Sequence, residues 1–260
     1  MRARRLAVVG VVFLALIGLA LPLSAQNFAT DIPLLSGGSE RVLFAAPAAP
    51  RAILIMFPGG AGTVEISANG TTTNRNFLVR TLPLWVAQGF AVEIVGSPNG
   101  APLLGERHTP AYVAAIGRAV DFARSRANVP IWLVGTSQGS TAAANGAAHL
   151  GSKIAGVVLS SSVTRPNRSG ETVFDGDPGL IAVPALIVAN QGDTCRVTPP
   201  SDATSVAAAI ARSPRTEVII VASDQIQSDP CEAMSPHGYL GIEPAVVQRI
   251  SDWIRAAPVR

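Results

Sequence analysis

The stretch IWLVGTSQG at residues 131–139 decides the fold of this chain. Four apolar residues lead into a G-x-S-x-G turn, and a run of small residues at 138–150 follows, so the pattern predicts a strand, a tight turn and a helix. In such a turn the serine adopts a strained backbone conformation. Its hydroxyl then projects at the N-terminus of the helix, where the helix dipole favours developing negative charge. The pattern therefore predicts Ser137 as a nucleophile, with the backbone N–H of Gln138 beside it; the plain alternative is an ordinary glycine-rich turn.

Apolar runs of strand length alternate with helix-length segments on both sides of this turn. Strands are predicted at 51–57, 90–95, 131–135, 154–159, 184–189 and 217–221, and helices at 77–88, 110–127, 138–150, 201–212 and 243–256. Pro83 is expected to break or kink the first of these helices. Continuous apolar strands separated by helices predict an α/β fold with a parallel sheet covered on both faces. Ligands bind such sheets at the carboxyl ends of the strands.

With this order of elements and with the G-x-S-x-G motif around Ser137, the chain resembles the α/β-hydrolase superfamily over essentially all of residues 26–260. The resemblance implies an α/β-hydrolase fold, with a mostly parallel central sheet and helices on both faces. It also implies a nucleophile, an acid and a histidine in that order along the chain, and an oxyanion hole after an earlier strand. Residues 161–183 stand where the family often carries a lid. They are too few for several helices, so a small cap or none is expected.

The resemblance implies His237 as the catalytic base, because it is the only histidine after the helix that follows Ser137. His149 lies at the end of that helix. His108 precedes the nucleophile and could line the pocket, but its place in the chain is wrong for the base. Asn99 and Arg107 are also considered as substrate contacts. Their simpler explanation is that they are solvated polar residues of loops.

The acid of the triad is expected to be Asp193, in the loop directly after the predicted strand at 184–189. This position resembles the family's strand-then-acid arrangement, in which the acid fixes the histidine and stabilises its charged form. Asp224 and Asp229 lie in the loop before His237 and remain alternatives. Asp202 is expected near the start of a helix instead.

The oxyanion hole is expected in the Pro58-Gly59-Gly60-Ala61 segment that follows the strand at 51–57. Comparison with the family's His-Gly-Gly-Gly motif implies that Gly60 donates a backbone N–H together with Gln138, with Ala61 as the neighbouring option. The match is partial, because Pro58 stands where the family often has its histidine. A simple glycine-rich turn is the alternative.

The N-terminus has the pattern of a secretory signal peptide. Three arginines precede a nearly unbroken apolar run at 6–23, and small residues at 23–25 offer a cleavage point. We therefore predict a signal peptide at 1–25, a hydrolase domain at 26–260, and a secreted or periplasmic protein. The run is long for a signal peptide, so a membrane anchor that is not cleaved is the alternative.

Removal of this segment would cancel the charge excess of the chain. The whole sequence has 20 basic and 17 acidic residues, and three of the basic ones are Arg2, Arg4 and Arg5. No basic run remains, so a nucleic-acid partner is not expected. After cleavage, no stable membrane insertion is expected. The expected partner is a small-molecule ester or acyl substrate.

The two cysteines, Cys195 and Cys231, are expected to form a disulfide, because export implies an oxidising compartment. By the positions implied for Asp193 and His237, the bond would tie the acid loop to the histidine loop. The chain has no His or Cys cluster with ligand spacing, so no metal and no other cofactor is predicted.

These residues predict a serine hydrolase that cleaves a carboxylic ester or related acyl bond through an acyl-enzyme on Ser137. An acyltransferase or a peptidase would use the same groups. A binding protein on a hydrolase scaffold, without catalysis, is a further alternative. The sequence does not specify the substrate or the oligomeric state.

Overall fold

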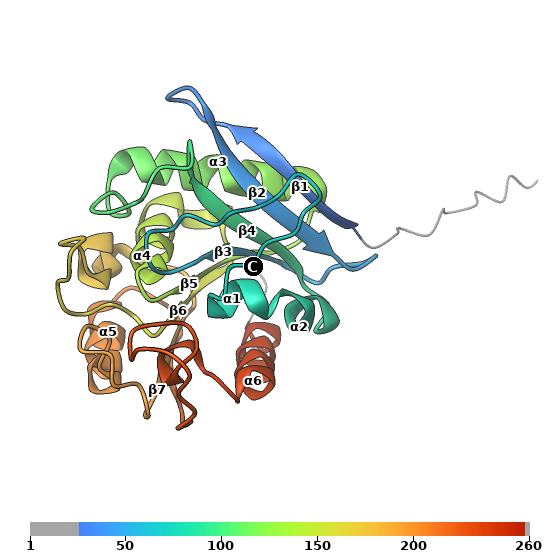
Figure 1. Cartoon of the computed structure of the whole chain (residues 1–260). Helices are drawn as coiled ribbons and strands as arrows, with labels where there is room; N and C mark the ends of the chain where they lie inside the picture. Colours follow the sequence, from blue (N-terminus) through green and yellow to red (C-terminus); the bar gives the residue numbers. More distant parts are fainter. Residues whose placement is uncertain (1–25, 258–260) are drawn as a thin grey trace, which may run out of the picture.

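The computed structural model describes residues 26–257, so the predicted signal peptide lies outside the described residues. An eight-stranded sheet forms the centre of the molecule, in the order β1-β2-β4-β3-β5-β6-β7-β8 (Figure 1). The strands are β1 Gln26–Pro33, β2 Ser39–Ala46, β3 Ile53–Phe57, β4 Ala91–Pro98, β5 Ile131–Thr136, β6 Gly156–Ser160, β7 Ala185–Asn190 and β8 Thr216–Val221. Every pairing from β4 to β8 is parallel, whereas β1 with β2 and β2 with β4 are antiparallel. The predicted mostly parallel sheet is therefore confirmed.

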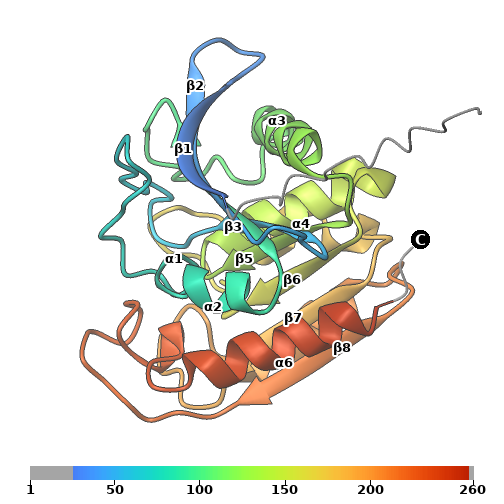
Figure 2. The same ribbon diagram turned by 90° about the vertical axis from the view of Figure 1, so that its right-hand side faces the viewer.

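Helices cover both faces of this sheet (Figure 2). The α-helices are α1 Phe77–Arg80, α2 Leu82–Ala87, α3 Pro110–Arg126, α4 Gly139–Leu150, α5 Ala203–Ala209 and α6 Glu243–Arg255. Buried residues of α3, α4 and α5 share one hydrophobic cluster with one face of the sheet. Those of α1, α2 and α6 share a second cluster with the other face. Two apolar layers thus enclose a sheet whose central strands β3, β5, β6 and β7 are entirely buried.

The predicted helix at 77–88 is divided into α1 and α2 at Thr81. Pro83 occupies the first turn of α2, where a missing N–H costs nothing, so the expected break occurs just before the proline. The helix predicted at 201–212 is shorter than expected. It ends at Ala209, and Ile210 has left the helical conformation.

The antiparallel hairpin of β1 and β2 was not among the predicted strands. Its first strand, QNFATDIP, mixes polar and apolar residues and has mainly half-buried positions, so it lacks the continuous apolar run that marks the central strands. The available signal was the Ser36-Gly37-Gly38 turn.

The segment at 161–183 contains two short 3-10 helices, η2 Val173–Gly176 and η3 Pro178–Leu180. No α-helix occurs in it, which agrees with the expected small or absent cap. Among residues 26–257, no helix combines the length and the apolar character needed to cross a membrane.

Candidate active site

Ser137 lies in the turn between β5 and α4, at the carboxyl edge of the parallel strands. It is one of few non-glycine residues with a positive φ, at 54°. Such a conformation is unfavourable for a side chain with a Cβ and is found where the surrounding structure enforces it. The backbone N–H of Ser137 donates to the carbonyl of Ser160 on the neighbouring strand, at 3.0 Å, which holds the strained turn in place.

The glycines of the motif make this turn sterically possible. A Cβ on Gly139 would lie 1.9 Å from the backbone oxygen of Phe57, and one on Gly135 would lie 2.2 Å from the oxygen of Gly139. Gly59, in the facing loop, has room for no Cβ either, because it would meet the Cβ of Ser137 at 2.7 Å. The chain therefore needs glycine at these positions to bring the two loops together around the serine.

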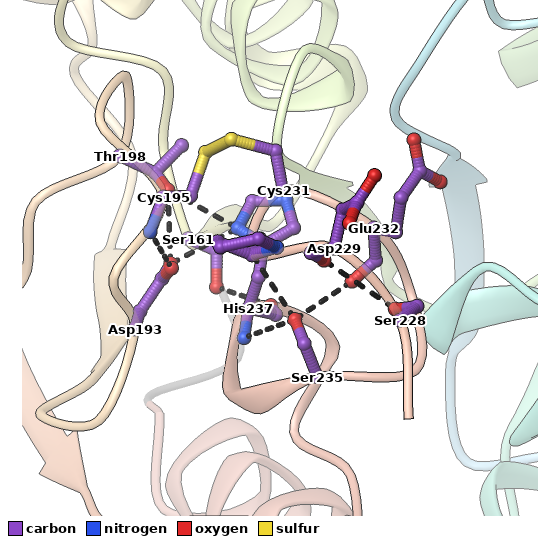
Figure 3. The surroundings of a disulfide bond; sticks show 11 residues. Ser161, Asp193, Cys195, Thr198, Ser228, Asp229, Cys231, Glu232, Ser235 and His237 are labelled. Carbon is purple, nitrogen blue, oxygen red and sulfur yellow. Dashed lines mark hydrogen bonds and ion pairs between the residues drawn. A yellow bond between two sulfur atoms is a disulfide. The ribbon is translucent and has the colours of Figure 1, made fainter. Parts of the chain in front are cut away.

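His237 and Asp193 form a buried hydrogen-bonded pair (Figure 3). The Nδ1 atom of His237 lies 2.9 Å from Oδ2 of Asp193. The side chains of the two residues are 6% and 1% exposed, respectively, so water competes little for this contact. With a proton on Nδ1, the imidazole presents an unprotonated Nε2, which is the form that a general base requires.

Thr198 is a third member of this cluster, and its sequence position gave no sign of it. Its Oγ1 donates to Oδ2 of Asp193 at 2.9 Å and lies 3.1 Å from Nδ1 of His237. The other carboxylate oxygen of Asp193 accepts the backbone N–H of Cys195 at 2.9 Å. Oδ2 of Asp193 thus has a donor in addition to the histidine, and Oδ1 has a donor of its own. Together these hydrogen bonds fix the orientation of the carboxylate.

The disulfide between Cys195 and Cys231 is present and passes close to the histidine ring (Figure 3). It joins the loop that carries Asp193 to the loop that carries His237. On the other side of the histidine, the hydroxyl of Ser161 lies 2.9 Å from the backbone oxygen of His237. His237 is therefore held by its ring, its backbone and a covalent link between the two loops.

Ser137 and His237 line the same cavity, of about 320 Å³. Its walls come from the loop after β3, from residues 74–77, and from residues 231–238. Among the described residues no hydrogen bond joins the two side chains. Catalytic hydrogen bonds are often loose until substrate is bound, so shared access to one cavity is the relevant observation.

The backbone around Gly60 is fixed by a buried arginine. Nη2 of Arg107 donates to the carbonyl oxygen of Gly60 at 2.8 Å. Because a trans peptide holds its C=O and N–H antiparallel, the N–H of Ala61 points away from Arg107. Gly60 and Ala61 both line the cavity with Ser137. No turn, loop or side-chain hydrogen bond within residues 26–257 uses the N–H of Gly60, Ala61 or Gln138.

Arg107 itself does not reach the cavity. Its side chain is 1% exposed and forms an ion pair with Glu171 at 3.2 Å, so it supports the loop rather than contacting substrate. His108 is 42% exposed and lies against the same glutamate. His149, near the end of α4, pairs with Asp177 at the surface. Neither His108 nor His149 forms a hydrogen bond with Ser137.

The alternative acids are exposed and far less constrained than Asp193. Asp224 and Asp229 are both exposed in the loop before His237, and neither side chain bonds to the histidine. Asp202 precedes α5 and accepts a hydrogen bond from Thr164. Of the acids considered, Asp193 alone meets the histidine.

Asp193, Cys195 and His237 place possible metal-ligand atoms within 4.8 Å of one another. The sulfur of Cys195 is bonded to Cys231, and a disulfide sulfur lacks the thiolate that binds metals. The remaining carboxylate and imidazole bond to each other. This donor set does not fit a metal ion.

Comparison with solved structures identifies the architecture as the α/β-hydrolase fold. An esterase of Pyrococcus furiosus matches with a TM-score of 0.65 and 12% identity, covering 93% of this chain and 95% of its own. A dienelactone hydrolase from Anabaena variabilis matches with a TM-score of 0.63 and 13% identity, covering 91% and 100%. A cold-adapted esterase from an Arctic intertidal metagenomic library has a TM-score of 0.62 and 14% identity, covering 88% and 94%.

No protein-family model and no curated protein sequence matches this chain. At such low identity the structural likeness establishes the fold and not the reaction. The fold implied by the resemblance is therefore confirmed.

Proposed function

We propose that this protein is a serine hydrolase that cleaves a carboxylic ester through an acyl-enzyme on Ser137. The observation that carries the proposal is the buried 2.9 Å contact between His237 and Asp193, with His237 opening into the same cavity as the strained Ser137. The esterases and hydrolases that share the fold are consistent with this reaction class.

In the first half of the reaction, Oγ of Ser137 attacks the ester carbonyl carbon while Nε2 of His237 accepts the hydroxyl proton. The carbonyl oxygen becomes an oxyanion, which receives hydrogen bonds from the N–H of Gln138 and from the Gly60–Ala61 turn. Collapse of this intermediate breaks the bond to the alcohol. The imidazolium of His237 protonates the leaving oxygen, and the acyl group stays on Ser137.

Water completes the cycle by the same route. His237 takes a proton from a water molecule, the hydroxide attacks the acyl carbon, and Ser137 leaves with the proton returned to it. Asp193 keeps the proton on Nδ1 and stabilises the imidazolium in both halves. Besides the ester and water, this scheme uses only side chains and backbone N–H groups of this chain.

We further propose that the protein acts outside the cytoplasm. The signal-peptide pattern at 1–25 supports export, and the disulfide is compatible with an extracellular location. N-terminal sequencing of the protein recovered from its native host would test this: a mature chain that begins near residue 26 supports export with cleavage, whereas an intact N-terminus contradicts cleavage.

The reaction is tested with a fluorophosphonate probe and a panel of p-nitrophenyl esters of different chain length. The wild type should be labelled on Ser137 and should hydrolyse at least one ester. The variant Ser137→Ala should lose labelling and should lose activity by a factor of at least about 10³. A folded Ser137→Ala protein with wild-type activity would contradict the proposal. A folded wild type that never reacts with probe or ester would favour a binding protein.

A further inference from the structure

The cavity of Ser137 has few apolar walls. Apart from Phe77, Ala61 and Ala233, its lining consists of glycines, polar side chains and Cys231. No leucine, isoleucine, valine or methionine of residues 26–257 lines it. The ring of Phe77 offers little surface, because this residue is only 1% exposed. A long hydrocarbon chain would therefore bury little apolar surface here, and the lining favours a short or polar substrate.

One wall of this cavity presents hydrogen-bond donors. It consists of residues 74–76, between β3 and α1, and we call it the donor wall. Oδ1 of Asn74 accepts the backbone N–H of Asn76 at 2.8 Å. Oδ1 of Asn76 in turn accepts the backbone N–H of Leu78 at 3.1 Å. Because both carbonyl oxygens are engaged in these bonds, each amide retains its NH2 group as a donor.

The donors of this wall are unused and accessible. Within residues 26–257, no hydrogen bond involves Nδ2 of Asn74 or of Asn76, and neither nitrogen is buried. Arg75 is exposed, and its guanidinium forms no ion pair with any acid of the described chain. Nearby Arg80, by contrast, is paired with Glu243 at 3.0 Å. A guanidinium and two amides thus remain available to a molecule in the cavity.

Glu232 brings the single carboxylate of the cavity lining. It is exposed, and its side chain extends away from His237 (Figure 3). A cationic group in the cavity would find this one carboxylate. An anionic group would find three donor groups on consecutive residues, one of them charged, and charge-assisted hydrogen bonds are the strong ones. The lining therefore favours an anion.

We propose that the donor wall binds a carboxylate of the substrate and that Arg75 is the residue that selects it. The inference rests on the proposed function. The planar guanidinium matches a carboxylate with two parallel hydrogen bonds, and the amides of Asn74 and Asn76 can add further ones. Arg75 and Ser137 line one cavity of about 320 Å³, so the carboxylate and the reacting ester belong to one small molecule. The substrate class is an ester with a free carboxylate in its acyl part or in its alcohol part.

The test uses two pairs of small esters in which a carboxylate is exchanged for a neutral amide. Monoethyl succinate and ethyl succinamate differ in the acyl part, whereas acetoxyacetate and acetoxyacetamide differ in the alcohol part. Hydrolysis is followed by pH-stat titration at neutral pH. The charge preference is kcat/KM for the carboxylate divided by kcat/KM for the amide. Comparison of this ratio between wild type and variant cancels the intrinsic reactivity of the esters.

Arg75→Gln should lower the charge preference at least about fivefold in one pair or in both, because an ion pair with the bound substrate is lost. The pair that responds identifies the part of the substrate that carries the carboxylate. Arg75→Lys keeps the positive charge and should retain most of the preference. An unchanged preference of Arg75→Gln in both pairs would overturn the inference.

Two further variants control for the net charge of the protein. Arg212→Gln removes an exposed arginine that does not line the cavity, and it should keep the charge preference of the wild type. Glu232→Gln removes the carboxylate that competes for Arg75, and it should raise the preference. A decrease in Arg212→Gln as large as that in Arg75→Gln would overturn the assignment to the donor wall. A decrease in Glu232→Gln would contradict it as well.

p-Nitrophenyl acetate separates this inference from the proposed function, because it carries no carboxylate. Its hydrolysis by the wild type, with loss in Ser137→Ala, would sustain the proposed reaction whatever the charge preference is. Failure of the wild type on this ester and on both pairs would instead overturn the proposed function, and the inference with it.

Discussion

Thr198 shows how much of a site depends on residues that no motif marks. Its hydroxyl has one proton, which it gives to Asp193, and its oxygen remains available to the N–H of His237. The hydroxyl thereby closes a ring of three polar groups that are nearly excluded from solvent. In the proposed reaction, Thr198 is a positioning residue that acts through the acid.

The substitution Thr198→Val should lower kcat about tenfold, because a hydrogen bond to a charged group contributes roughly 1.5–3 kcal/mol. KM should change little, since Thr198 does not line the cavity of Ser137. Steady-state kinetics over a range of pH would measure both and would also reveal any shift in the pH profile. Thr198→Ser, which keeps the hydroxyl, should restore most of the rate. Equal loss in the two variants would show that packing and not the hydrogen bond matters.

Residue types, with the chain order that the family resemblance implies, led to Ser137, His237 and Asp193 as candidates, because a strand–turn–helix pattern predicts a nucleophile and His237 is the only histidine after the helix that follows it. The partners of Asp193 were not predictable in this way. Thr198 reaches the carboxylate through the course of an irregular loop, and irregular loops leave no periodic signal. Glu93 is a different case, since a glutamate inside an apolar strand is visible in the sequence as a buried charge.

At the scale of the elements, the turn after β5 depends on close contact between two backbone segments. Gly139 begins α4 directly under the loop that follows β3. The local sequence predicts the turn. Gly139 is needed there because a loop that is distant along the chain lies against it.

Gly139→Ala should destabilise the protein by about 3 kcal/mol or prevent folding, because overpacking against rigid backbone costs roughly this much. Urea denaturation followed by circular dichroism would give the free energy of unfolding. Gly179→Ala is a suitable control, as the nearest atom to its added Cβ lies 3.8 Å away and the position is exposed. A Gly139→Ala protein as stable as the control would contradict the steric explanation.

The disulfide acts at the same scale, on the two loops that carry Asp193 and His237. Closure of a loop of this length contributes on the order of 4 kcal/mol in the chain-entropy model. The double variant Cys195→Ser, Cys231→Ser should therefore be less stable. At a temperature where it is still folded, kcat should also fall about tenfold, because an acid–base pair that is less well held spends less time aligned.

Thermal melts and kinetics on the same samples would separate the two effects of the disulfide. Wild-type kcat in a folded double variant would contradict a role for the disulfide in positioning. Loss of stability alone would then be its whole effect.

For the whole molecule, two buried carboxyl groups link stability to pH. Glu40 and Glu93 are 1% and 0% exposed, and none of their four carboxyl oxygens has a hydrogen-bond partner among the described residues. Burial raises the pKa of Glu40 to about 8. Burial, with a smaller contribution from Glu40, raises the pKa of Glu93 well above its usual value. Tyr112, Arg107 and Glu171 lie in the same electrostatic neighbourhood.

Because these pKa values are raised on folding, the folded state holds protons that the unfolded state releases above pH 4.5. The free energy of unfolding should therefore decrease as the pH rises from about 4.5 to 8, by up to about 1.4 kcal/mol per pH unit for each group. Urea denaturation at pH 5, 6.5 and 8 would measure it. Glu40→Gln, which removes one of the titrating groups, should flatten the dependence. An unchanged slope in that variant would assign the effect to other groups.

Ser137 lies in a sterically locked turn, whereas the walls of its cavity come from loops, and this difference has a consequence for protein engineering. Substitutions at Gly135 or Gly139 meet backbone within 3 Å, so a mutant library directed at that turn will consist mainly of unfolded proteins. The exposed side chains of Thr63, Arg75 and Glu232 come from loops that line the cavity of Ser137, and none of them belongs to the hydrophobic clusters. Selection for new substrates should therefore enrich changes in these loops, and the same catalytic scaffold should survive many rounds of diversification.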